Sequence, residues 1–125
     1  MRPKSPTLTP QELEIMKIVW GKGEATVREV YETLLARRRI AYTTVMTMMR
    51  VLERKGYLKT SREERAYLYR PTRPERQVLR SMVREFVDRV FNGSARPLLV
   101  HLVEDRRLSK RELDELQRLV REVEK

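Results

Sequence analysis

Residues 42–58 read YTTVMTMMRVLERKGYL, a segment in which hydroxyl and guanidinium groups recur at helical spacing. With about 100° between successive residues, Thr43, Thr47, Arg50 and Arg54 fall on one side of a helix. Threonine hydroxyls form hydrogen bonds with base edges in DNA, and an arginine side chain grips guanine through two hydrogen bonds. The chemistry that this segment offers is therefore recognition of a nucleic acid rather than bond breaking.

The opposite side of the same helix is apolar, with Val45, Met48, Met49 and Leu52 close together in helical phase. We expect these four residues in a core. A helix in the major groove of DNA needs short side chains near its N-terminus and longer ones where it must reach. We predict base contacts from Thr43, Thr44, Met46, Thr47 and Arg50. The alternative is an ordinary solvated helix face with basic residues near its C-terminus.

Groups that catalyse reactions or bind metals are scarce in this chain. It contains no cysteine and a single histidine, His101, which excludes disulfides, a thiol nucleophile and a site of several histidines. The sequence offers no nucleophile paired with a base and no glycine-rich phosphate loop. We predict that the protein is not an enzyme and that it uses no metal or cofactor.

The charge of the chain points to a polyanionic partner. The 125 residues include 28 Lys and Arg against 18 Asp and Glu, a formal net charge of +10. Residues 1–72 carry +7 of it and residues 73–125 carry +3. No apolar run approaches the roughly 18 residues that span a bilayer, and no signal-peptide core begins the chain. We therefore expect a cytoplasmic protein whose N-terminal half binds nucleic acid.

Capping boxes of the type Ser/Thr-x-x-Glu mark four expected helix starts, at Thr9, Thr26, Thr72 and Ser109. We expect the first helix to run from Pro10 to Trp20, ended by Gly21 and Gly23, with Trp20 in the core. The second helix follows Thr26, places an apolar stripe at residues 27, 30, 31 and 34, and ends in three arginines at 37–39. The third helix spans 43–55 and ends at Gly56.

The hydrophobic period then changes from helix to strand. Residues 57–61 predict a short strand, residues 62–65 a charged turn, and residues 66–69 a return strand ended by Pro71. We expect at least one of Tyr67 and Tyr69 to pack the hairpin onto the helices. Three helices and a hairpin predict a mainly α winged helix-turn-helix domain with a small β-hairpin wing. Phosphate contacts are predicted for Arg54, Lys59, Arg62 and Arg65.

The chain beyond residue 72 is helical again, with a helix to Phe91, a short apolar helix around Pro97 to Glu104, and a last helix from Lys110. Its apolar surface is wider than about 50 residues can bury in a monomer. We therefore predict a winged-helix domain over residues 1–72 and a helical dimerisation domain over 73–125. The predicted homodimer interface consists of Leu79, Met82, Val83, Phe86, Val90, Leu113, Leu116 and Val120.

Four segments carry a resemblance to a known family. They are LTPQELEIMKIVW, TVREVYETL, AYTTVMTMMRVLERKGYL and RAYLYRP, and they resemble the BlaI/MecI/CopY family of bacterial repressors, the penicillinase-repressor family. The resemblance covers the chain from Leu8 to about Leu119. It implies a dimeric winged-helix repressor that binds a palindromic operator in double-stranded DNA and blocks transcription, with the C-terminal helices as the dimerisation domain.

For the BlaI and MecI branches, the resemblance also implies induction by a membrane-bound sensor metalloprotease that cuts the repressor between Asn and Phe, before Val-Glu. The matching positions here are His101 and Leu102, before Val103 and Glu104, so neither scissile residue is kept. The copper-sensing branch uses a cysteine-rich metal site, which this chain lacks. Two alternatives stay open: a winged-helix module that binds another protein, and a repressor that senses a small ligand without proteolysis.

Overall fold

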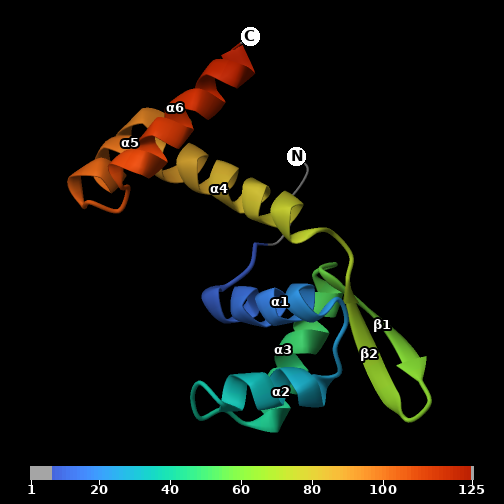
Figure 1. Ribbon diagram of the computed structural model, residues 1–125. Helices are drawn as coiled ribbons and strands as arrows, with labels where there is room; N and C mark the ends of the chain where they lie inside the picture. Colours follow the sequence, from blue (N-terminus) through green and yellow to red (C-terminus); the bar gives the residue numbers. More distant parts are fainter. Residues whose placement is uncertain (1–6, 125) are drawn as a thin grey trace. The chain divides into compact units, whose positions relative to one another are not determined.

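The structure is a computed structural model that describes residues 7–124, apart from the side chains of residues 120, 123 and 124. It contains α1 (Pro10–Lys22), α2 (Val27–Leu35), α3 (Tyr42–Arg54), β1 (Leu58–Glu63), β2 (Ala66–Pro71), α4 (Glu75–Phe91), α5 (Ala95–Glu104) and α6 (Lys110–Glu124) (Figure 1). This order of elements confirms the predicted fold class, mainly helical with one two-stranded hairpin.

The chain divides into two compact units, Met1–Arg80 and Ser81–Lys125, whose boundary lies within α4. The sequence predicted a DNA-binding domain over residues 1–72 and a dimerisation domain over residues 73–125. These domain assignments stay predictions. No helix in the described part of the chain is both long and apolar enough to cross a membrane.

Three of the four predicted capping boxes form, at Thr9, Thr26 and Ser109. The fourth, at Thr72, was wrong. The Thr72 hydroxyl donates to the Gly56 carbonyl oxygen at 2.6 Å, and α4 begins only at Glu75. Pro74 precedes the helix, and its carbonyl oxygen accepts a hydrogen bond from the Val78 amide in the first turn. Thr72 thus ties the start of α4 to the loop after α3.

The core of the first unit lies where α1, α2 and α3 meet. Its fully buried side chains come from all three helices and from β1: Ile15, Met16, Val19, Val30, Leu34, Val45, Met49, Leu52 and Leu58. Trp20, expected in this core, is only half-buried. Its indole N–H donates to the carbonyl oxygen of Arg73 at 2.9 Å. Gly21 does not break α1, which continues to Lys22 and ends at Gly23, where φ is 86°.

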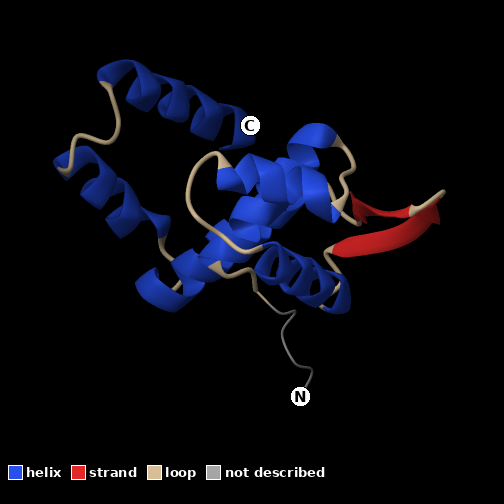
Figure 2. Ribbon diagram, turned by 90° about the horizontal axis from the view of Figure 1, so that it is seen from below, coloured by secondary structure: helices blue, strands red, loops and turns tan. Residues whose placement is uncertain are grey.

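The hairpin is longer than predicted and its turn is tighter. Glu63 pairs with Ala66, so Arg62 lies in β1 rather than in the turn, which consists of Glu64 and Arg65. Glu64 adopts the left-handed conformation, with φ of 53°, that a two-residue turn needs. Figure 2 shows the two strands extending away from the helices of the first unit.

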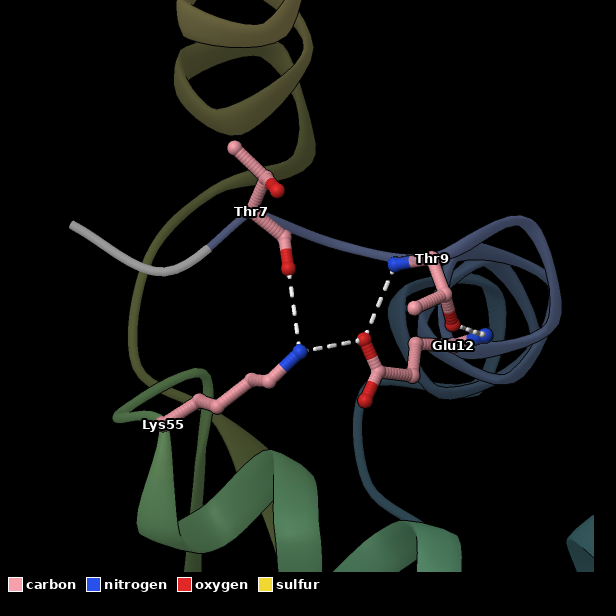
Figure 3. A network of polar contacts seen from close by, with 4 residues as sticks. All are labelled: Thr7, Thr9, Glu12 and Lys55. Atoms are coloured by element: carbon pink, nitrogen blue, oxygen red, sulfur yellow. Dashed lines mark hydrogen bonds and ion pairs between the residues drawn. The ribbon is translucent and has the colours of Figure 1, made fainter. Parts of the chain in front are cut away.

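Helix α3 is tied to the start of α1 by a partly buried ion pair (Figure 3). The Lys55 ammonium, directly after α3, lies 2.7 Å from Oε1 of Glu12 and donates to the Thr7 carbonyl oxygen at 3.0 Å. The same Glu12 oxygen accepts the Thr9 amide at 2.9 Å, and the Thr9 hydroxyl accepts the Glu12 amide at 3.2 Å. One carboxylate therefore caps α1 and holds the C-terminal end of α3.

The second unit leaves much of its apolar surface exposed. Phe86 and Phe91 contact each other edge to face, with ring centroids 5.8 Å apart, and Phe91 also lies 6.0 Å from the His101 ring. Yet no side chain described after Val78 is buried. Large apolar residues that stay exposed are Val83, Phe86, Val90, Leu99, Val100, Val103 and Leu119. A surface of this kind is typical of an interaction site.

The Glu12–Lys55 pair predicts acid-sensitive stability. Burial alone raises the pKa of Glu12, but hydrogen bonds from Lys55 and Thr9 and the positive charge of Lys55 outweigh it, so the pKa lies below its usual 4.5. Because the folded carboxylate binds fewer protons than the unfolded one, its stabilisation is present above pH 4.5 and is lost as the pH falls through the folded pKa. Glu12→Gln should cost about 1–3 kcal/mol at neutral pH.

The measurement is urea unfolding followed by the fluorescence of Trp20, the single tryptophan, at pH values from neutral down to about 3. We expect the variant to lose less stability than the parent as the pH falls. Glu53→Gln removes an exposed carboxylate from α3 and is the control for the change in net charge. Equal pH dependence of the parent and Glu12→Gln would contradict the prediction.

Candidate nucleic-acid interface

Helix α3 has one buried face and one exposed polar face. Val45, Met49 and Leu52 are fully buried against the other helices, and Met48 is half-buried. The residues predicted to contact bases lie on the other face: Thr43, Thr44, Thr47 and Arg50 are exposed and Met46 is half-buried. The structure thus brings the five predicted base contacts together on one accessible surface.

A groove of about 600 Å³ separates this face of α3 from the hairpin. Arg50 and Arg54 line it from α3, and Arg62 and Tyr67 line it from the strands. Two of the four predicted phosphate contacts, Arg54 and Arg62, therefore line the same groove as Arg50, a predicted base contact. Glu53 also lines the groove, and it is the one carboxylate among the described residues that do so.

The other two predicted phosphate contacts lie elsewhere on the hairpin. Arg65 is exposed in the turn, and Lys59 is exposed on β1 opposite Arg70, outside the residues that line this groove. Arg70 is held by Glu24, with 2.7 Å between Nε and Oε2, and this hydrogen bond raises the pKa of the arginine. Lys59 on β1 and Arg65 in the turn therefore do not line this groove.

Two of the three arginines that follow α2 have a structural partner. Arg38 and Arg37 both pair with Glu14 of α1, Arg37 at 3.6 Å, so these cations join α2 to α1. Within the described part of the chain, ion pairs engage neither Arg50 nor Arg54 on α3. The cations of α3 are thus available to an external anion, unlike Arg37 and Arg38.

The two tyrosines of β2 have different roles. Tyr69 is 5% exposed, and its amide and carbonyl exchange hydrogen bonds with Ala25, at 2.8 and 3.0 Å. Tyr67 is 57% exposed, and the guanidinium carbon of Arg62 lies 5.8 Å from its ring centroid. The expectation that at least one tyrosine packs the hairpin onto the helices is met by Tyr69.

Arg28 was not singled out from the sequence, although it lies beside the exposed face of α3. Its guanidinium carbon is 5.6 Å from the ring centroid of Tyr42, the first residue of α3. In the sequence, Arg28 is one more cation on an exposed helix face. Its proximity to α3 comes from the packing of α2 against α3, which no local pattern contains.

A family model described as penicillinase repressor matches residues 8–122. The chain belongs to the penicillinase repressor family. The family resemblance predicted from the sequence is therefore confirmed. Among curated members, the chain is 29% identical to the penicillinase repressor of Bacillus licheniformis, over 95% of this chain and 93% of the relative. It is 37% identical to the transcriptional regulator BlaI of Mycobacterium tuberculosis, over 90% of this chain and 82% of the relative.

Two solved structures resemble part of this family member. One is the solution structure of the DNA binding domain of the repressor BlaI, with a TM-score of 0.53 and 31% identity over 59% of this chain and 90% of that chain. The other is Bacillus licheniformis BlaI in monomeric form in complex with the blaP half-operator, with a TM-score of 0.51 and 32% identity over 58% and 88%. Both support the winged helix-turn-helix fold.

Loss of the Tyr69 side chain should loosen the hairpin, whereas loss of Tyr67 should not. Tyr69→Ala removes a buried ring and should cost about 3–5 kcal/mol. Tyr67→Ala removes an exposed ring and a cation–π contact, at about 1 kcal/mol or less. Urea unfolding followed by Trp20 fluorescence compares the two variants directly. Similar losses from both substitutions would show that Tyr69 does not anchor the hairpin.

Proposed function

We propose that the protein is a sequence-specific transcriptional repressor that binds a palindromic operator as a homodimer. The observation that carries this proposal is the exposed threonine and arginine face of α3, in a family member that resembles BlaI bound to its half-operator. In a helix-turn-helix, the second helix of the motif enters the major groove while the first crosses the DNA backbone. Here these helices are α3 and α2.

The polar face of α3 suits a major groove about 12 Å wide. The side chains near its N-terminus, Thr43, Thr44 and Thr47, are short enough for the helix to approach base edges. The Met46 and threonine methyl groups can contact a thymine methyl group, and Arg50 can bond guanine through two hydrogen bonds. We assign sequence readout to these five residues.

Backbone contacts are assigned to Arg54, Lys59, Arg62 and Arg65. Arg54 and Arg62 line the groove of the protein beside Arg50. The DNA backbone that borders the major groove would pass there. Lys59 and Arg65 extend the positive surface along the hairpin. Such contacts supply affinity and salt dependence, whereas α3 supplies specificity. Binding to chromosomal DNA agrees with the expected cytoplasmic location.

Dimerisation is assigned to the second unit together with the α4 residues before it. Val83, Phe86 and Val90 are exposed on α4, whereas Leu79, Met82, Leu113 and Leu116 are half-buried. The side chain of Val120 lies outside the described residues. A second copy of the chain would cover this apolar surface, and a two-fold axis would match a palindrome.

The proposed route of regulation is cleavage of the repressor between His101 and Leu102. Both residues lie inside α5, with His101 exposed and Leu102 half-buried. A protease that reads an extended chain would need α5 to unwind first. Co-expression of the protein with a sensor protease, followed by mass spectrometry of the fragments, tests whether this bond is cut.

Arg50 and Arg62 should differ in how they affect binding. Arg50→Ala should cost about 1–3 kcal/mol on an operator and much less on random duplex, because it removes a base contact. Arg62→Ala should weaken binding to both duplexes similarly and reduce the slope of log K against log salt by about 0.9 per protomer. Fluorescence anisotropy titrations at several salt concentrations measure both. Equal losses on both duplexes from Arg50→Ala would remove it as a base reader.

Phe86→Asp should break the homodimer, because it places a charge on the exposed apolar face of α4. We expect at least a tenfold weaker dimer, about 1.4 kcal/mol, by sedimentation at micromolar protein concentration. Ser81→Asp adds the same charge at an exposed polar position of α4 and is the control. A Phe86→Asp variant that stays dimeric and binds operator normally would place the interface elsewhere.

A further inference from the structure

A second groove, of about 400 Å³, lies between α2, α3 and the turn of the hairpin. Its cationic wall is formed by Arg28 of α2, Arg50 of α3 and Arg65 of the turn, and its apolar wall includes Tyr42, Met46 and Tyr67. None of the described residues that line it carries a carboxylate. The first groove, in contrast, contains Glu53. The second groove is therefore the more favourable of the two for an anion.

Arg28 is held in place at the edge of this groove. Its guanidinium lies over the Tyr42 ring at 5.6 Å, and Tyr42 itself meets the Tyr31 ring edge to face, with centroids 5.4 Å apart. A guanidinium stacked on an aromatic ring has fewer conformations to lose when it binds an anion. The pair thus links a residue of α2 to the first residue of α3.

We propose that Arg28 is a further contact to the DNA backbone and that Tyr42 is its positioning residue, a role that rests on the DNA binding proposed above. Helix α2 is the helix that crosses the backbone when α3 lies in the major groove. Arg28 stands in its first turn, on the groove that also contains Arg50 and Met46. A phosphate held by Arg28 would flank the bases that Arg50 and Met46 contact.

One carboxylate competes for Arg28. Glu32 lies one helical turn further along α2, with 3.6 Å between Arg28 Nη1 and Glu32 Oε1. Both side chains are more than 60% exposed, and exposed pairs of this spacing are weak and screened by salt. A DNA phosphate can therefore replace Glu32 as the partner of a guanidinium that stays stacked on the Tyr42 ring.

The test uses the full-length protein, an operator selected by the wild-type protein from a random-sequence duplex library, and an unselected duplex. Arg28→Gln should weaken binding to both duplexes by a similar factor and lower the salt slope by about 0.9 per protomer. Arg28→Lys should restore the slope, because it restores the charge. Trp20 fluorescence checks that every variant unfolds at the same urea concentration.

Arg73 provides the matched control. It also stacks on a tyrosine of the first unit, with its guanidinium carbon 5.6 Å from the Tyr57 ring centroid, but it is not among the residues that line the groove. Arg73→Gln removes the same charge and should leave the salt slope unchanged. A loss as large as that of Arg28→Gln would show that only total charge matters, and would overturn the proposal.

The positioning role of Tyr42 is tested by a double-mutant cycle. Tyr42→Leu should weaken binding in the wild-type background and add no loss in the Arg28→Gln background. The same factor in both backgrounds would mean that Tyr42 supports α3 directly and does not act through Arg28. If the wild-type protein selects no operator, the proposed function fails. If it selects one and Arg28→Gln binds it normally with an unchanged slope, only the role of Arg28 fails.

Discussion

The division of α3 into two faces is the constraint on which the rest of the first unit depends. One face must bury Val45, Met49 and Leu52 to hold the helix in the core, and the other must keep its threonines and arginines in water. Burial of three apolar side chains is the larger energetic term, so the core sets the rotation of α3 about its own axis. The polar face is then directed outward by the core, since no ion pair within the described residues engages Arg50 or Arg54.

Polar contacts around this core determine the position of α3 and the hairpin more closely. The Glu12–Lys55 pair joins the C-terminal end of α3 to the start of α1, and the hydrogen bonds between Tyr69 and Ala25 join the hairpin to the segment before α2. Thr72 bonds the chain back to Gly56 where the hairpin ends. The surface around Arg50 is therefore built from elements that are each bonded to a neighbour, which favours a preorganised binding surface.

Several cations of the first unit differ in their partners, which composition alone cannot reveal. Arg37, Arg38, Lys55 and Arg70 pair with carboxylates of the first unit and stabilise it. Arg50 and Arg54 form no such pair within the described chain, and Arg62 stacks on a tyrosine beside a groove. Arg28 also stacks on a tyrosine, and its one ion pair, with Glu32, is exposed. The net charge of +10 therefore does not show which cations are offered to a partner or where they lie.

The sequence by itself determined the order of the elements, the buried face of α3 and three of the four helix caps, because all of these follow from contacts within a few residues. It placed the start of α4 and the turn of the hairpin wrongly, since Pro74 and the pairing of Glu63 with Ala66 prevailed over the local pattern. Tertiary structure alone decided which arginines pair with carboxylates of other elements and which line a groove. Arg28 meets Tyr42, and Lys55 meets Glu12, only because separate helices pack together, and the energy of such contacts depends on distances that no local spacing specifies.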